Sequence, residues 1–366
     1  MSRKNSWVVR FVFILMTITC LLPLQSYAAV DPEVLQDALP EDAQTVLDHV
    51  TPENVDLKGG LTGLWNRAKE ILGDYIRQAM GIGILMLGAC LVLALAVGFS
   101  GDAGLQLPER SIDFTAVAIL LTIYFSTGNG LIHECTQAIS GLDGFVQVMT
   151  PVYAVVSAMA GHPVSAVAVG EITLLFSAVV SWLSRYIILP GIGLYVLMDA
   201  VGGLLSVGLL GKLAELLRWA IGKGMKWILT GFTAYHTLSG IITRSTDTFA
   251  IKTAQSAISS LIPVVGSLIS GTSDALLGGA NLLRASVGIY GLLSVCAICL
   301  GPIIRAAAHF LVFKVLSTCA SAYLGGAASR TLRAITEGYG MAVAALAMCC
   351  TVEFISIVVS AVVTAS

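Results

Sequence analysis

Long apolar runs, almost free of charged residues, dominate this sequence from residue 80 to its end. Of the 366 residues, 56% are hydrophobic and only 11% are charged, and the mean hydropathy is +0.87. Soluble domains carry about 25% charged residues, so a water-soluble fold of this chain would lack the polar groups needed to cover its surface. The sequence therefore predicts an all-α, polytopic membrane protein whose partner is the lipid bilayer.

The number of membrane spans follows from the length of these runs, because a helix needs about 20 apolar residues to cross a bilayer. Glycine and proline interrupt several runs, most clearly at 161–163 and at Gly301-Pro302. Residues 80–366 are therefore expected to form a multi-span domain with seven to nine spans, some of them broken or re-entrant. The candidate runs are 80–99, 114–132, 150–160, 164–182, 186–210, 227–243, 286–300, 303–324 and 339–363.

Residues 1–28 are typical of a secretory signal peptide. A basic start precedes an apolar run, which ends in the small-x-small sequence SYA at residues 26–28. The alternative is an uncleaved anchor helix. Both interpretations place Val30 outside the cytoplasm.

The next two segments are more polar than the rest of the chain. Residues 29–60 form an acidic extracytoplasmic segment with too few apolar residues for a core. Residues 61–79 repeat apolar side chains at helical spacing between charged ones, which predicts an amphipathic helix at the membrane interface. The alternative for 61–79 is a helix packed on a partner protein.

Basic residues orient the chain, because positively charged loops stay on the cytoplasmic side. The most basic loop is predicted at residues 211–226, so an odd number of spans should precede it. Residues 244–284 are then expected on the extracytoplasmic side. Arg330 and Arg333 are expected there too, which conflicts with the same charge rule.

No catalytic or cofactor motif is present in the sequence. Gly211-Lys212 lacks the rest of a phosphate-binding loop, and the sequence HECTQ at 133–137 lacks the second histidine of a zinc site. The net charge of −2 provides no basic stripe for nucleic acid. We therefore expect no enzyme activity, no cofactor, no metal and no nucleic-acid partner.

Three carboxylates interrupt apolar runs, namely Glu171, Asp199 and Glu353. A charge such as Asp at the centre of a membrane helix costs roughly 2.5–3.5 kcal/mol on insertion scales. One interpretation is a pore lining or a relay for protons or ions. The other, which the residues favour, is a hydrogen bond between helices.

Residues 262–284, IPVVGSLISGTSDALLGGANLLR, are too polar for a simple span. Pro263 suits the first turn of a helix, and small residues then recur every fourth position, which allows another helix to approach closely. This helix is either a packing seam or a pore-side or subunit-contact element. A second copy of the chain is one candidate partner for such a contact. The candidate assembly residues are Pro263, Gly266, Ser267, Gly271, Asp274, Ala275, Gly279 and Arg284.

The same region resembles the stage III sporulation protein AE family. The motifs that carry the resemblance are Pro263 to Gly266, Asp274, Leu282-Leu283-Arg284 and Val287 to Gly291, followed by Pro302, Lys314 and Gly325-Gly326. The resemblance implies a non-enzymatic subunit of the channel complex between mother cell and forespore, in the mother-cell membrane around the forespore. It also implies that the partners include a separate ATPase-like subunit and stage II sporulation protein Q.

A self-contained secondary transporter is the alternative function. Glu171, Asp199 and the broken spans favour it, since transporters bind substrates at discontinuous helices near buried charges. No inverted repeat is evident in the sequence, which counts against it.

Overall fold

A computed structural model describes residues 32–47, 50–51, 55–102, 109–159, 174–205, 208–261, 266–321 and 326–363. These residues are almost entirely helical and include no strand. The side chains of 236–284 and of several residues near helix ends lie outside the description. The elements are α2 (Pro32–Asp37), α3 (Glu41–Val46), α4 (Leu57–Asp102), α5 (Glu109–Met159), η2 (Ser184–Ile188), α7 (Leu189–Leu205), α8 (Gly208–Leu261), α9 (Gly266–Ala320) and α10 (Gly326–Val363).

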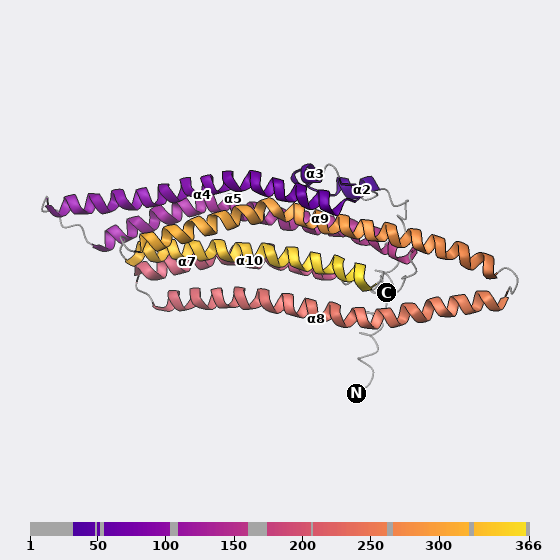
Figure 1. Ribbon diagram of the computed structural model, residues 1–366. Helices are drawn as coiled ribbons and strands as arrows, with labels where there is room; N and C mark the ends of the chain where they lie inside the picture. Colours follow the sequence, from indigo (N-terminus) through magenta and orange to yellow (C-terminus); the bar gives the residue numbers. More distant parts are fainter. Residues whose placement is uncertain are drawn as a thin grey trace, which may run out of the picture.

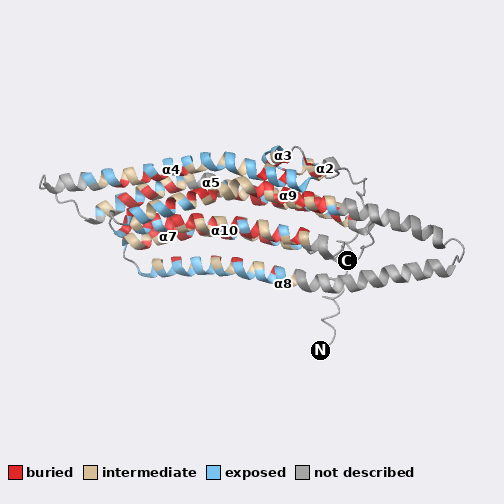
Figure 2. Cartoon of the chain, viewed as in Figure 1, coloured by how far each residue is buried: buried red, intermediate tan, exposed pale blue. Residues whose placement is uncertain are grey.

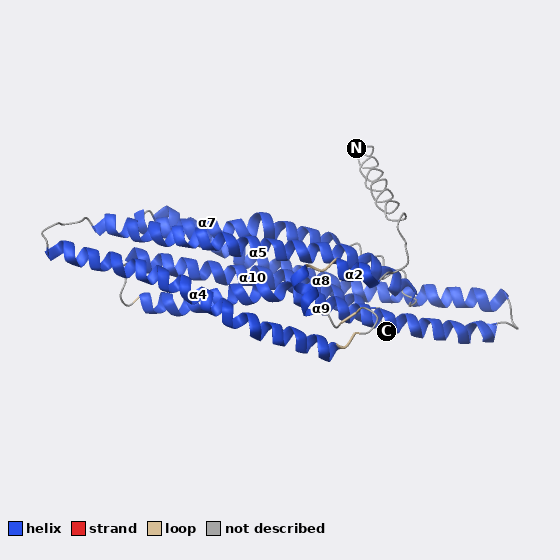
Figure 3. Ribbon diagram, turned by 90° about the horizontal axis from the view of Figure 1, so that it is seen from above, coloured by secondary structure: helices blue, strands red, loops and turns tan. Residues whose placement is uncertain are grey.

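The long helices lie side by side and alternate in direction along the chain (Figures 1 and 3). α9 lies in the middle and packs against α4, α5 and α10, whereas α8 packs on the outside against α7 and α10. The ends of α4, α7 and α9 therefore meet the starts of α5, α8 and α10 at one end of the bundle. We call this the basic end, because Lys212, Arg218, Arg330 and Arg333 lie there. The short helices α2 and α3 and the C-terminus lie towards the other end (Figure 1).

Five helices are long and apolar enough to cross a membrane: residues Leu57–Leu93, Ser111–Val156, Leu174–Leu205, Ala285–Ala320 and Gly326–Val358. Large apolar side chains such as Ile84, Val92 and Trp227 are exposed. Figure 2 shows that exposed residues lie on the outer faces of the long helices. The all-helical membrane fold is thus supported, but the count of seven to nine spans is not confirmed.

The helices are much longer than a bilayer is thick. α4 has 46 residues and α9 has 55, which at 1.5 Å per residue is about 69 and 83 Å, against a hydrocarbon core of about 30 Å. α4 and α9 therefore extend well beyond any membrane that they cross.

Several expected breaks are continuous helix. Runs 286–300 and 303–324 are largely one helix, because α9 passes through Gly301 and Pro302 to Ala320. α5 likewise continues through residues 133–149 and Pro151, and the predicted loop 211–226 lies inside α8. An internal proline removes one backbone hydrogen bond, and packing against neighbouring helices offsets that cost in α9. The expected break at 161–163 lies outside the described residues.

The acidic N-terminal segment is better packed than its sequence predicts. Leu35, Leu39, Ala43, Leu47 and Val50 are all buried. α2 packs on α5, and α3 packs on α9 and α4, so the apolar residues of the segment complete a core that other helices provide. These residues share the core of the bundle instead of forming one of their own.

Residues 61–79 form the first half of α4 and continue without a break into the expected span at 80–99. Within the segment Leu64 is buried, whereas the apolar side chains of Leu61 and Trp65 are exposed. Its location at the membrane interface stays a prediction.

Candidate functional site

The sequence-predicted assembly stripe begins where α9 begins. Gly266 is the first residue of α9, which agrees with a helix over the stripe. Pro263 and the side chains of 266–284 lie outside the described residues, so contacts of Ser267, Gly271, Asp274, Ala275, Gly279 and Arg284 stay a prediction. Glu171 also lies outside them.

Asp199 lines a cavity of about 620 Å³ at the basic end of the bundle. α7 contributes Tyr195 and Asp199, α8 contributes Lys212 and Arg218, and α10 contributes the arginines and Glu337. Asp199 is half-buried, and it lies near the positive charges of Arg330, Arg333 and Arg218 as well as the negative charge of Glu337. The hydrogen bond between helices that the sequence favours for Asp199 stays a prediction.

Glu337 links three helices inside this cavity. Its carboxylate is 2.8 Å from Arg218 Nη1 of α8 and accepts a hydrogen bond from the Tyr195 hydroxyl of α7. Both contacts are charge-assisted, and such hydrogen bonds are roughly twice as strong as neutral ones. Glu337 thus fixes α7, α8 and α10 together at the basic end.

Three other cations around the cavity form no ion pair with any described residue: Lys212, Arg330 and Arg333. Arg330 lies across Gly203 of α7, where a Cβ atom would be 2.6 Å from Arg330 Cδ. The glycine therefore allows the arginine to lie flat against α7. A guanidinium held in this way can bind a carboxylate or phosphate through two N–H groups, so the cavity can bind an anion.

Arg330 and Arg333 line the same cavity as Lys212 and Arg218, so all four basic residues lie at one end of the bundle. α9 is one helix where two spans were expected, and a single crossing there would place residue 330 on the same side of a membrane as the basic segment. All four residues would then obey the positive-inside rule, but the membrane topology stays a prediction.

Accessibility labelling checks this arrangement. In a background without the native cysteines, Lys212→Cys and Arg330→Cys are expected to react with a membrane-impermeant maleimide from the same side of the membrane. Thr45→Cys in α3 is expected to react only from the other side. Reaction of the first two from opposite sides would contradict the topology.

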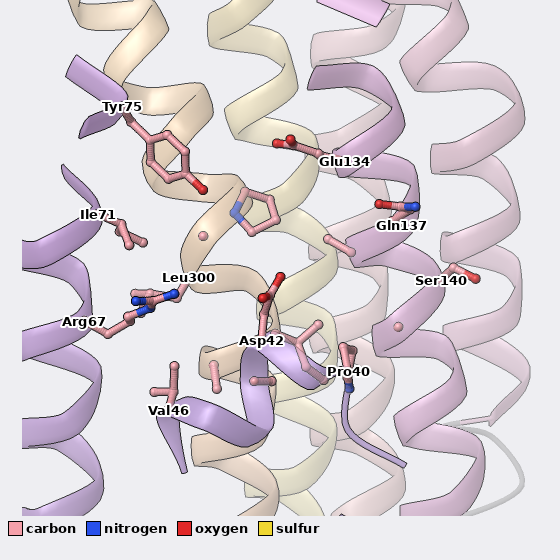
Figure 4. A pocket seen from close by; sticks show the side chains of 17 residues that line it. Pro40, Asp42, Val46, Arg67, Ile71, Tyr75, Glu134, Gln137, Ser140 and Leu300 are labelled. Carbon is pink, nitrogen blue, oxygen red and sulfur yellow. The ribbon is translucent and has the colours of Figure 1, made fainter. Parts of the chain in front are cut away.

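A second cavity, of about 680 Å³, lies beneath α3. Figure 4 shows Arg67 and Tyr75 of α4 on one side and Glu134, Gln137 and Ser140 of α5 on the other, with α9 behind them. Gly301 and Pro302 also line it, so the helix-breaking pair forms a cavity wall. α3 covers this cavity, so the acidic N-terminal segment contributes residues to the cavity wall.

A buried ion pair lies next to this second cavity. Arg305 of α9 pairs with Glu134 of α5 through Nη1 and Oε1, and its guanidinium lies 5.8 Å from the centre of the Tyr75 ring. Only 15% of the Arg305 side chain is exposed, and its Nε has no hydrogen-bond partner among the described residues. The Arg305 side chain therefore lies mainly between the helices rather than at the surface of the bundle.

Glu353 is buried inside the bundle, with 3% exposure. It lies near Ser177, Asp143 and the cysteines of α10, and Glu353 Oε2 has no hydrogen-bond partner among the described residues. The hydrogen bond between helices that the sequence favours for Glu353 therefore stays a prediction.

The partners of these charges were not predicted from the sequence. Asp199 and Glu353 stand out because each interrupts an apolar run, whereas Glu134 is part of an incomplete zinc motif. The signal in the sequence was that otherwise apolar helices carry charges of both signs, which can pair with each other. Such charges are Glu134 and Asp143, which pair with Arg305 and Arg185.

These features together define a multi-helix membrane protein with charged groups buried between its helices. The family model described as stage III sporulation protein AE matches residues 71–364. This chain belongs to that family. A similar protein, stage III sporulation protein AE of Bacillus subtilis (strain 168), is 24% identical over 282 residues, which is 77% of this chain and 70% of that protein. No solved structure matches the chain.

Proposed function

We propose that this chain is a membrane subunit of the channel complex that connects mother cell and forespore and supports late forespore gene expression. The match to the sporulation family over residues 71–364 carries the proposal. Five helices that can cross a membrane support a role within the bilayer. In this proposal the chain lies in the mother-cell membrane around the forespore and catalyses no reaction itself.

The two ends of the bundle suggest how such a subunit would meet its partners. The basic end, with Lys212, Arg330 and Arg333 unpaired among the described residues, suits a cytoplasmic contact with a separate ATPase-like subunit. The end that carries α2 and α3 follows the proposed signal peptide and would face stage II sporulation protein Q between the two membranes. A second copy of this chain is a further candidate partner, through the assembly stripe on α9.

Deletion of the gene in its host tests the proposal. We expect loss of late forespore gene expression and a fall in heat-resistant spores by several orders of magnitude, with engulfment intact. Expression of the chain in trans should restore spores, and an affinity-tagged copy should co-purify with other membrane proteins of the complex. Normal spore yield in the deletion strain would contradict the role in sporulation.

Reconstitution separates this role from that of a self-contained transporter. Purified chain in liposomes is expected to give no solute uptake above that of empty liposomes, because the channel would need its other subunits. Robust uptake by the chain alone would favour the transporter.

A further inference from the structure

Three buried oxygen atoms without hydrogen-bond partners come from three different segments of the bundle. They are Asp143 Oδ1 of α5, Ser177 Oγ of the helical residues 174–183, and Glu353 Oε2 of α10. Ser177 and Glu353 are 2% and 3% exposed. Buried polar atoms in proteins are nearly always hydrogen-bonded, so three such atoms in one region require an explanation.

The three groups are neighbours. The Ser177 hydroxyl lies beside the Glu353 carboxylate, and the charge of Asp143 acts on Glu353. The Ser177 hydroxyl is close enough to interact with the Glu353 carboxylate, but neither Ser177 Oγ nor Glu353 Oε2 has a hydrogen-bond partner of good geometry among the described residues. Oxygen atoms of three side chains thus lie near one another without a hydrogen bond that satisfies them, as the ligands of a cation site do.

A π-helical turn shapes one wall of this region. η2 carries Ser184, whose hydroxyl is 3.2 Å from the Cys349 sulfur, one turn before Glu353 on α10. η2 also carries Arg185, which is 3.5 Å from Asp143 Oδ2 and 3.4 Å from the Ser140 hydroxyl. Arg185 thus holds one oxygen of Asp143 and leaves the other, Oδ1, free. Single π turns inside helices occur frequently at functional sites.

The charges of the region do not balance. Arg185 compensates Asp143, and no other cation among the described residues pairs with Glu353. A deprotonated Glu353 would therefore leave one negative charge without a partner in the interior, where an unpaired charge is costly. One monovalent cation would neutralise it, whereas a divalent cation would leave an excess positive charge.

We propose that Asp143, Ser177 and Glu353 form a binding site for one monovalent cation, with Na⁺ as the probe. Carboxylate and hydroxyl oxygens are hard ligands that suit such an ion. The site joins α5, α10 and the helical residues before η2, so a bound ion would stabilise their packing. This inference does not depend on the sporulation role, because it concerns ion binding by the chain itself.

Thermal unfolding of the purified full chain in detergent tests the site. Na⁺ is compared with choline at equal ionic strength and pH. At about ten times its dissociation constant, Na⁺ is expected to raise the unfolding midpoint of the wild type by about 3 °C. Glu353→Gln, which preserves shape and removes the charge, is expected to abolish the shift.

Two further variants keep the test decisive. Glu337→Gln removes a carboxylate from the same helix but outside the site, so it should retain the sodium response. Ser177→Ala removes one ligand and should raise the Na⁺ concentration for half of the effect by about tenfold; it also serves if Glu353→Gln does not fold. A site that takes only a proton would give no sodium response in the wild type. That result, or an equal response in Glu353→Gln, would overturn the proposal.

Discussion

Arg305→Met is expected to lower the free energy of unfolding by about 3 kcal/mol. The substitution leaves Glu134 as a charge without its partner between α5 and α9, and removal of one member of a buried ion pair typically costs about 3–5 kcal/mol. We expect the lower end of that range, because the Glu134 side chain is 33% exposed. Thermal or denaturant unfolding in detergent measures the change.

A double variant separates the ion pair from the packing around it. Arg305→Met combined with Glu134→Gln should recover most of the lost stability, because apolar or neutral replacements of a buried pair are often tolerated. Arg77→Met provides the matched control, since its ion pair with Asp74 is highly exposed; surface pairs contribute about 0–1 kcal/mol. Equal losses for Arg305→Met and Arg77→Met would show that burial does not determine the effect.

The sequence predicts the fold class well because apolar content is a property of each segment alone. Runs such as 80–99 and 339–363 lie in long helices, as expected. The breaks were less predictable. Pro302 and Pro151 lower the intrinsic stability of a helix, but neighbouring helices hold α9 and α5 together through them. Tertiary packing thus overrides the local signal.

The candidate sites depend on contacts between residues far apart in the chain. Asp199 could be identified from its apolar surroundings, but nothing in that stretch indicates that Arg330 and Lys212 share its cavity. The packing of α2 and α3 has the same cause: Leu35 and Leu47 are too few to build a core, yet they can complete one that other helices provide. Contacts of this kind can be predicted only when the positions of the helices relative to one another are known.

The three ion pairs between helices have a feature in common. Arg218 with Glu337, Arg305 with Glu134, and Arg185 with Asp143 each join two different long segments of the bundle. A membrane offers no hydrophobic drive between helices, so packing and polar contacts must hold them together. These pairs therefore determine which helices are neighbours, and Glu353 stands apart because no described cation pairs with it.

Gly338→Ala is expected to destabilise the protein by about 2 kcal/mol, even though alanine is the better helix former. A Cβ atom at position 338 would be 2.7 Å from Val196 Cγ2, 3.4 Å from the Tyr124 hydroxyl and 3.5 Å from Ile192 Cγ2. Val196 is fully buried and cannot move aside freely. Overpacking typically costs about 1–3 kcal/mol, which outweighs the gain of about 1 kcal/mol in helix propensity.

Gly231→Ala is the matched control, because it makes the same chemical change inside α8, where no atom lies within 4 Å of the new Cβ. Here only helix propensity acts, so stability should rise by up to about 1 kcal/mol. The two substitutions are therefore expected to change the unfolding midpoint in opposite directions. If Gly338→Ala also raised the midpoint, α10 could not lie as close to α5 and α7 as the packing of Gly338 requires.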